Sequence, residues 1–184
     1  MSAFFTNPSI KFIILDIDGT LIDGNTPETI VERPHLDIFI RTLFHLFEGR
    51  VGIWTSAKLD WLYHVHEYHL KSKIPEPYTQ FKFLLHRDHC EKRNIFKAGL
   101  GWTPIFVKPL RLLRTFPIRS PDILPTEENT LIVDDNMDTF VDNPHQAIWV
   151  DRFIAFNSKR EIDDRIFVKV ITQIRQIMTN STTS

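Results

Sequence analysis

The sequence predicts an α/β fold of the Rossmann-like kind, a three-layer sandwich around a mainly parallel central sheet. Short apolar runs alternate along the chain with segments of helical periodicity, as in a sheet that is covered by helices. Several of these runs end abruptly in carboxylates, hydroxyl groups or a lysine. In parallel sheets such groups gather at the carboxyl ends of the strands, where ligands bind. With 184 residues and 42% hydrophobic content, the chain fits one domain.

The first predicted strand is the apolar run that opens residues 11–21, KFIILDIDGTL, and it ends at two carboxylates. Side chains of a strand alternate between faces, so Asp16 and Asp18 can project the same way where the strand breaks into a loop. Two converging negative charges repel each other unless a cation or protons offset them. A divalent metal bound together with a phosphate ester is the commonest chemical setting for such a pair.

A helix, a second strand and a second helix come next. Pro34 opens the first helix and Gly49 ends it. Its apolar positions recur at helical spacing, at Leu36, Phe39, Ile40, Leu43, Phe44 and Phe47. The apolar strand 51–54 then leads into Thr55 and Ser56, whose hydroxyl and backbone N–H groups can bind phosphate oxygens at a helix start. The periodic positions of the second helix are Leu59, Leu62, Tyr63 and His66.

The third polar cluster contains a lysine. After a predicted loop at 71–80, the apolar run 105–107 leads into Lys108 and Pro109. A proline favours an extended conformation for the residue before it and suits the first turn of a following helix. We therefore expect Lys108 to lie at the end of a strand, directly before a helix.

The last predicted strand, at 130–133, leads into a second carboxylate pair, Asp134 and Asp135. Ser158 and Glu161 have the spacing of a capping box at the start of the final helix. The apolar positions of that helix are Ile162, Ile166, Val170, Ile174 and Ile177. The domain boundaries that follow are an N-terminal extension at 1–9, one domain at 10–178, and a polar tail at 179–184 that we expect to be disordered.

Each polar cluster also has an ordinary structural explanation. Thr55 can cap a helix, Lys108 can be a solvated charge, and each aspartate pair can belong to a turn. Taken singly, the ordinary explanation is the more frequent one. Together, at the ends of successive apolar runs, the clusters favour one shared site for a metal ion and a phosphate group.

The order of the clusters resembles the four motifs of the haloacid dehalogenase superfamily of phosphotransferases and phosphatases, which begin with a segment like DIDGTL. This resemblance implies that Asp16 attacks phosphorus to form an aspartyl-phosphate and that Asp18 acts as general acid and base. It also implies that Thr20 braces the loop through a hydrogen bond and that Gly19 permits its tight backbone path. The phosphate-binding residues expected from it are Thr55, Ser56 and Lys108.

The same resemblance implies a Mg²⁺ cofactor, because phosphoryl transfer depends mainly on positioning and charge neutralisation. Mg²⁺ prefers hard oxygen ligands. The expected ligands are Asp16, the backbone carbonyl of Asp18, and one of the pair Asp134 and Asp135. The sequence leaves open which member of that pair binds the metal directly.

The segments between the motifs resemble the RNA polymerase II C-terminal-domain phosphatases, the NLI-interacting-factor-like family, over residues 10–178. The similar segments are 31–39, 51–57, 85–90, 133–136 and 143–148. Residues 107–110 and the compact spacing are most similar to the catalytic domain of the member that contains a ubiquitin-like domain. The resemblance implies a phosphorylated protein or peptide substrate and hydrolysis of phosphoserine or phosphothreonine.

Little of the chain is left to cover the site. The stretch from Asp18 to Arg33 is too short for a cap domain, and residues 91–103 can form only a small flap. An uncovered site favours a protein or another large phosphoester over a small metabolite. The alternatives are a small-molecule phosphatase of the same superfamily and a catalytically silent phosphoprotein-binding module, which the intact acidic residues disfavour.

Composition bounds the partners and the compartment. A net charge of −1 argues against general nucleic-acid binding, and there is neither a signal peptide nor a membrane-length apolar run. The single cysteine, Cys90, excludes an internal disulfide and leads us to expect an intracellular, reducing compartment. The basic stretch between Arg87 and Arg119 has two interpretations, a surface that steers an anionic substrate and an ordinary solvated face.

Three other motifs fail for lack of required partners. A calcium loop that starts at Asp16 would need Glu at its twelfth position, which is Pro27. The sequence HRD at 86–88 has none of the other kinase motifs. His89 and Cys90, together with His86, lack a fourth zinc ligand at useful spacing.

Overall fold

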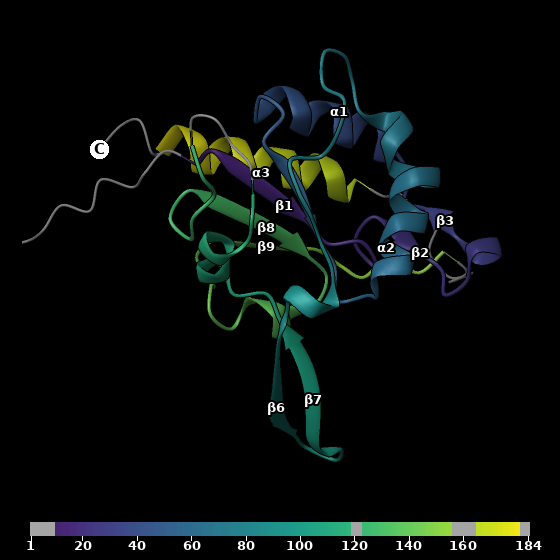
Figure 1. The fold of residues 1–184 in the computed structure, drawn as a ribbon, viewed down its shortest axis with the longest axis vertical. Helices are drawn as coiled ribbons and strands as arrows, with labels where there is room; N and C mark the ends of the chain where they lie inside the picture. Colours follow the sequence, from purple (N-terminus) through teal and green to yellow (C-terminus); the bar gives the residue numbers. More distant parts are fainter. Residues whose placement is uncertain (1–9, 119–122, 156–164, 181–184) are drawn as a thin grey trace, which may run out of the picture.

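In the computed structural model, which describes residues 10–118, 123–155 and 165–180, a five-stranded sheet lies at the centre of the molecule (Figure 1). All neighbouring strands in it are parallel. In spatial order the strands are β5 (Leu84–Leu85), β4 (Val51–Trp54), β1 (Phe12–Leu15), β8 (Thr130–Asp134) and β9 (Ala147–Trp149). The predicted α/β fold with a central parallel sheet is confirmed.

The three central strands are buried on both faces. In β1, Ile13 and Leu15 belong to the hydrophobic cluster on one face of the sheet, and Phe12 and Ile14 belong to the cluster on the other. Alternate side chains of a strand point to opposite faces, so the sequence of a strand that is covered on both faces is an unbroken apolar run. This burial explains why β1, β4 and β8 are recognisable in the sequence.

Helices cover the two faces unequally. The cluster on one face contains side chains of α1 (Leu36–Leu46), α2 (Leu59–Val65) and α3 (Ile166–Asn180). Phe39 of α1 stacks on Phe167 of α3, with ring centroids 3.9 Å apart. The other cluster contains side chains of two short 3₁₀ helices, η5 (Leu110–Thr115) and η6 (Met137–Phe140). Both short helices follow a polar cluster of the sequence, so they help to place those residues.

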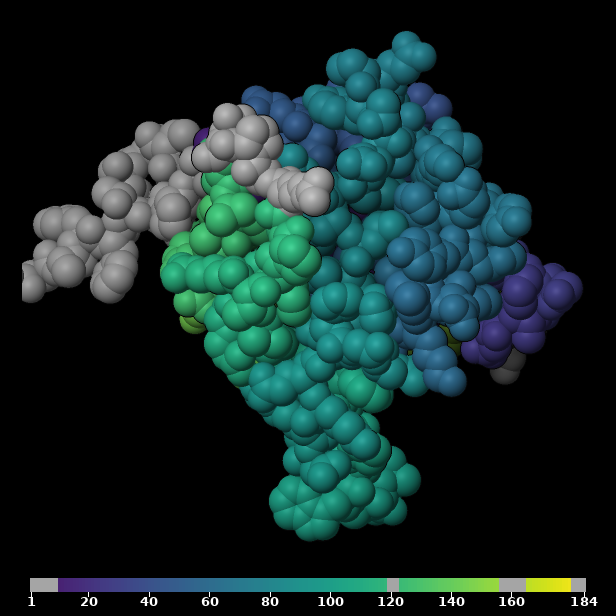
Figure 2. Space-filling model, in the orientation of Figure 1, coloured from purple at the N-terminus to yellow at the C-terminus, as the bar shows by residue number. Residues whose placement is uncertain are grey.

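Two small antiparallel pairs lie outside the central sheet. One joins β2 (Ile22–Asp23) to β3 (Val31–Glu32), and the other joins β6 (Glu91–Lys97) to β7 (Gly101–Val107). The β6–β7 hairpin stands out from the body of the molecule (Figures 1 and 2). It is the small flap expected at 91–103, and no cap domain is present among the described residues. The remaining short helical segments are η1 (Pro27–Thr29), η2 (His66–Leu70), η3 (Lys71–Lys73) and η4 (Arg87–His89).

Two details of the sequence-based expectation need correction. The run 105–107 is a strand, but it pairs in the hairpin instead of the parallel sheet. The expected loop at 71–80 begins as the helical turn η3, which continues the path of α2 through η2.

The end of α3 also differs from the expectation. Helix α3 continues through Asn180, although we expected a disordered tail from residue 179. The Thr179 hydroxyl donates to the Arg175 carbonyl at 3.0 Å, which satisfies a polar side chain inside the helix. The predicted capping box at 158 and 161, the extension at 1–9 and the tail at 181–184 lie outside the described residues. Within the described part, no helix is long and apolar enough to cross a membrane.

Candidate active site

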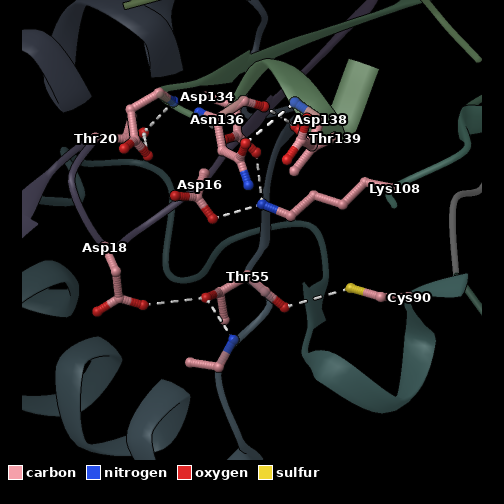
Figure 3. A network of polar contacts seen from close by, with 12 residues as sticks. Asp16, Asp18, Thr20, Thr55, Cys90, Lys108, Asp134, Asn136, Asp138 and Thr139 are labelled. Atoms are coloured by element: carbon pink, nitrogen blue, oxygen red, sulfur yellow. Dashed lines mark hydrogen bonds and ion pairs between the residues drawn. The ribbon is translucent and has the colours of Figure 1, made fainter. Parts of the chain in front are cut away.

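Strand β1 ends at two aspartates that are held by different partners. The Asp16 side chain is buried, and its backbone N–H donates to the Val133 carbonyl of β8 at 2.9 Å. Asp18 lies two residues further, in the loop. Its carboxylate accepts hydrogen bonds from Trp61 Nε1 at 2.7 Å and from Thr55 Oγ1 at 3.3 Å. Figure 3 shows Thr55 directed at Asp18, while Asp16 points toward a separate group of residues.

Strand β4 brings Thr55 to this edge of the sheet. Thr55 is fully buried, and its N–H extends the ladder to the Leu85 carbonyl of β5 at 3.0 Å. Its hydroxyl accepts a hydrogen bond from the Ala57 N–H at 3.0 Å, so the turn that follows is closed around the side chain. Ser56 is the next residue, and its carbonyl accepts from Arg87 Nε at 2.6 Å.

Lys108 follows β7 and reaches across the site between two carboxylates. Its Nζ donates to Asp16 Oδ1 at 2.5 Å and to Asp134 Oδ2 at 2.7 Å, and its side chain is 1% exposed (Figure 3). Asn143 fixes the lysine backbone, because its Nδ2 donates to the Lys108 carbonyl at 3.0 Å while its Oδ1 accepts from the Leu110 N–H at 3.1 Å. The ammonium group therefore bridges the ends of β1 and β8.

Asp135 is held by the loop that follows β1. Thr20 Oγ1 donates to Asp135 Oδ1 at 3.3 Å and accepts from the Asp135 N–H at 3.0 Å. Arg152 Nη1 donates to Asp135 Oδ2 at 3.0 Å. The loop can come this close because Gly19 has φ +85° and no side chain. A Cβ at Gly19 would lie 2.5 Å from Asp135 Oδ2.

Three of the carboxylates form a candidate metal centre. Asp16, Asp134 and Asp135 each offer one oxygen, and these oxygens all lie within 4.8 Å of one another. An all-oxygen set of hard ligands suits a divalent cation such as Mg²⁺ or Mn²⁺, and it does not suit soft metals. The donor chemistry of the cluster therefore fits the metal that the sequence implies.

The charges of this cluster perturb each other. Burial, reinforced by the charge of Asp134, raises the pKa of Asp16 well above its usual value, and Lys108 opposes that rise. Burial alone would lower the pKa of Lys108, but the adjacent Asp134 and Asp16 charges outweigh it, so the pKa of the lysine is raised. Burial and Asp134 also raise the pKa of Asp135, against the opposing effect of Arg152. Lys108 is therefore a permanent cation among crowded carboxylates.

Asp18 has a different electrostatic environment. Burial is the main influence and raises the pKa of Asp18, whereas the hydrogen bonds from Trp61 and Thr55 lower it. These two partners are neutral donors, in contrast to the ammonium group that holds Asp16. Asp18 is thus suited to exchanging a proton, because no cation among the described residues is bonded directly to its carboxylate.

Cys90 lies near the site without nucleophilic character. Its thiol is directed at the Thr55 carbonyl, 3.7 Å away (Figure 3). Burial raises the pKa of the Cys90 thiol to about 11. The thiol is therefore protonated at neutral pH, whereas reactive cysteines are thiolates.

Local partners neutralise much of the basic stretch between Arg87 and Arg119. Arg93 pairs with Glu91 at 2.9 Å and with Asp142 at 2.7 Å. Arg111 also pairs with Glu91, at 2.6 Å. These ion pairs favour the interpretation of an ordinary solvated face over that of a surface that steers an anionic substrate.

The structure brings most of the sequence-predicted residues to one edge of the sheet. Those in the polar network are Asp16, Asp18, Thr20, Thr55, Lys108, Asp134 and Asp135. Sequence reasoning missed Trp61, Asn143 and Arg152, which hold three of these groups. Two of them had a signal in the sequence: Trp61 is an indole donor in the first turn of the helix after Thr55, and Asn143 opens the family-like segment 143–148. The contact of Arg152, and the atoms that Asn143 binds, depend on tertiary structure.

Sequence and structure comparisons identify known proteins that are similar to this chain. The rat ubiquitin-like domain-containing CTD phosphatase 1 is 24% identical over 170 residues, which cover 91% of this chain and 49% of that protein. The structure of Fcp1, an essential RNA polymerase II CTD phosphatase, matches with a TM-score of 0.50 at 17% identity, over 94% of this chain and 51% of that one. A fission yeast Fcp1 variant bound to beryllium fluoride matches with a TM-score of 0.50 at 16% identity, over 94% and 53% of the two chains.

The chain thus spans about half the length of these relatives, and the two structures establish a shared fold. The family model for NLI interacting factor-like phosphatases matches residues 11–182, which is nearly the whole sequence. The strand-end carboxylates, the threonine and the buried lysine all lie within that match. The chain is therefore a member of the NLI interacting factor-like phosphatase family.

Proposed function

We propose that this chain is a Mg²⁺-dependent phosphatase that hydrolyses phosphoserine or phosphothreonine in protein segments through an aspartyl-phosphate on Asp16. The observation that carries the proposal is the buried contact of Lys108 with both Asp16 and Asp134. The contact joins the ends of the neighbouring strands β1 and β8 through one ammonium group, which supports roles as nucleophile for Asp16, as fixed cation for Lys108 and as metal ligand for Asp134. Membership of a phosphatase family supports the reaction class.

The first half of the reaction transfers the phosphoryl group to the protein. A carboxylate oxygen of Asp16 attacks phosphorus, a new P–O bond forms, and the bond from phosphorus to the serine or threonine oxygen breaks. Asp18 donates its proton to that leaving oxygen, which departs as an alcohol. Burial raises the pKa of Asp18 and so increases the fraction of enzyme that has this proton available.

The second half restores the enzyme. Asp18, now a carboxylate, accepts a proton from a water molecule as the water oxygen attacks phosphorus. The acyl phosphate bond to Asp16 breaks and inorganic phosphate is released. Lys108 stays charged throughout, since its pKa is raised, and it stabilises the negative oxygens that surround phosphorus in both steps.

A divalent ion would be held by the carboxylates of Asp16, Asp134 and Asp135, with the backbone carbonyl of Asp18 as a further ligand. When bound, Mg²⁺ would offset the charge of these groups and of the phosphate. Thr55 and Ser56 would bind oxygens of the phosphate group. The close packing of negative groups is the reason to expect a strict metal requirement.

The open surroundings of the site favour a macromolecular substrate. Between Asp18 and Arg33 the chain forms only the β2–β3 pair and η1, and the β6–β7 hairpin projects from the body instead of forming a closed cap (Figures 1 and 2). A phosphorylated side chain on a protein segment can enter such a site from solvent. The relatives named as CTD phosphatases support this choice of substrate class.

Hydrolysis of an aryl phosphate tests the proposal most directly. The wild-type protein should hydrolyse the aryl phosphate with Mg²⁺ and should lose this activity when a chelator is added. The hydrolysis rate of Asp16→Asn should be at least about a thousandfold lower. Asp37→Asn, which changes an exposed aspartate on α1, is the matched control and should retain full activity. Full activity of a folded Asp16→Asn protein would refute the mechanism.

The same assay separates the two alternatives. A silent phosphoprotein-binding module would bind a phosphoserine peptide but show no Mg²⁺-dependent turnover of any ester. A small-molecule phosphatase would prefer a member of a phosphometabolite panel over every phosphopeptide. The proposal requires turnover with phosphopeptides as the better substrates.

A further inference from the structure

Trp61 makes the shortest hydrogen bond to the proposed general acid. Its indole Nε1 donates to Asp18 Oδ1 at 2.7 Å, while the second oxygen, Oδ2, accepts from Thr55 Oγ1 at 3.3 Å. Thr55 directly follows β4 and Trp61 lies in the first turn of α2, and both are separate from the chain segment that contains Asp18. The orientation of the Asp18 carboxyl group is therefore set from outside its own loop.

In the contact between Trp61 and Asp18, the indole is always the donor and the carboxyl oxygen is always the acceptor. An indole N–H can only donate, so the oxygen that it contacts must remain an acceptor in both protonation states of the acid. When Asp18 is protonated, its carbonyl oxygen is the stronger acceptor, so the Trp61 contact favours Oδ1 as the carbonyl oxygen and Oδ2 as the oxygen that holds the proton. A hydroxyl such as Thr55 can donate or accept, so it is compatible with a proton on the oxygen that it faces.

The position of Trp61 makes it a rigid support. The indole is partly buried and packs against the main hydrophobic cluster, and it stacks on His64 with ring planes 20° apart. The backbone of Trp61 belongs to the first turn of α2, and the neighbouring Leu62 is fully buried. The donor atom is thus fixed by packing before any substrate arrives.

We propose that Trp61 is a positioning residue that holds Asp18 with its proton-bearing oxygen, Oδ2, available to the leaving group. This inference rests on the proposed phosphatase function and adds to it a specific residue for the proton-transfer step. Trp61 does not contact the reacting atoms. It acts by fixing which oxygen of Asp18 delivers the proton.

The test uses the leaving group as a probe. An alkyl phosphate, such as a phosphoserine peptide, needs a proton on its departing oxygen, whereas dinitrophenyl phosphate has a leaving group that departs as a stable anion. Trp61→Phe keeps an aromatic ring but removes the donor. We expect kcat/KM for the phosphoserine peptide to fall about tenfold or more, and kcat/KM for dinitrophenyl phosphate to change by less than about twofold.

Two further variants make the result interpretable. Asp18→Asn should show the same selectivity to a greater degree, because it removes the acid itself. Trp102→Phe changes an exposed tryptophan at the hairpin tip and should leave both values of kcat/KM unchanged. Equal losses on both substrates in Trp61→Phe, or no loss on either, would overturn the positioning role.

The failure of this inference is distinguishable from failure of the proposed function. If the wild type hydrolyses neither ester, the proposed function fails. Suppose instead that the wild type is active and that Asp18→Asn loses more kcat/KM on the phosphoserine peptide than on dinitrophenyl phosphate. If Trp61→Phe does not show this difference, only the inference fails.

A measurement on the tryptophan itself covers the case in which Trp61→Phe does not fold. In the wild-type protein the Trp61 indole proton should exchange slowly with solvent, as seen by NMR. In a folded Asp18→Ala protein its exchange should be at least about tenfold faster, because the acceptor is lost. Unchanged exchange would overturn the inference.

Discussion

Replacement of Lys108 by methionine tests the charge balance of the site. The side chain is 1% exposed and its ammonium group lies 2.5 Å from Asp16 and 2.7 Å from Asp134. Removing one partner of a buried ion pair leaves uncompensated charge and costs about 3–5 kcal/mol. We expect Lys108→Met to lower the free energy of unfolding by that amount in the absence of metal. Catalysis should fall at least about a hundredfold, since a fixed cation is lost beside the phosphate.

The deficit in stability should depend on pH in a definite direction. Burial and Asp134 raise the pKa of Asp16, and Lys108 opposes this rise, so the pKa of Asp16 climbs further in the variant. A carboxyl group whose pKa is higher in the folded state binds more protons there, and its folded state is stabilised at low pH. The contribution is lost as pH rises through the folded-state pKa. The gap between Lys108→Met and the wild type should therefore be wider at about pH 8 than at about pH 5.

Urea unfolding at the two pH values, with and without Mg²⁺, measures these quantities. A ligand at about a hundred times its dissociation constant stabilises the folded state by about 2.7 kcal/mol. Mg²⁺ should stabilise the variant more than the wild type, because no ammonium group competes for Asp16 and Asp134. Lys169→Met, at an exposed position on α3, is the matched control. A free energy of unfolding for Lys108→Met within about 1 kcal/mol of the wild-type value at both pH values would refute the reasoning.

Two other substitutions test the framework that holds these groups. Gly19→Ala should cost about 1–3 kcal/mol and reduce aryl phosphatase activity at least about tenfold, because a Cβ would collide with Asp135. Gly99→Ala, at φ +81° with nothing within 4 Å of the added Cβ, should retain full activity; equal activity losses would contradict the role of the collision. Asn143→Leu should cost about 2–4 kcal/mol in urea unfolding, because it leaves the Lys108 carbonyl and a backbone N–H unpaired. A loss below about 1 kcal/mol would contradict that assignment.

The sequence was most informative where burial is complete. Strands β1, β4 and β8 are covered on both faces, so each is an apolar run that ends at a polar residue. The edge strands β5 and β9, with two and three residues, are too short to leave a periodic pattern. The run 105–107 has the same local pattern as a core strand, yet it pairs with β6, because a local pattern does not specify the partner.

The site shows a similar division between local and tertiary information. Asp16 and Lys108 are recognisable because each breaks an apolar run, and that break is a local property. Trp61, Asn143 and Arg152 lie on a helix or in loops where polar and aromatic residues are common. Their roles depend on which atoms the fold brings within hydrogen-bonding distance. Such partners become visible only when the strands are placed beside each other.

The arrangement of charge explains why metal and substrate are expected to bind as a pair. Three carboxylates share one cluster, and within the described part of the chain Lys108 and Arg152 are the cations bonded to them. A phosphate monoester alone would add negative charge to a cluster in which burial and crowding already raise the pKa of Asp16 and Asp135. A divalent ion alone would lie next to the fixed ammonium group. Bound together, the two ligands cancel most of each other's charge, so each should increase the affinity of the other.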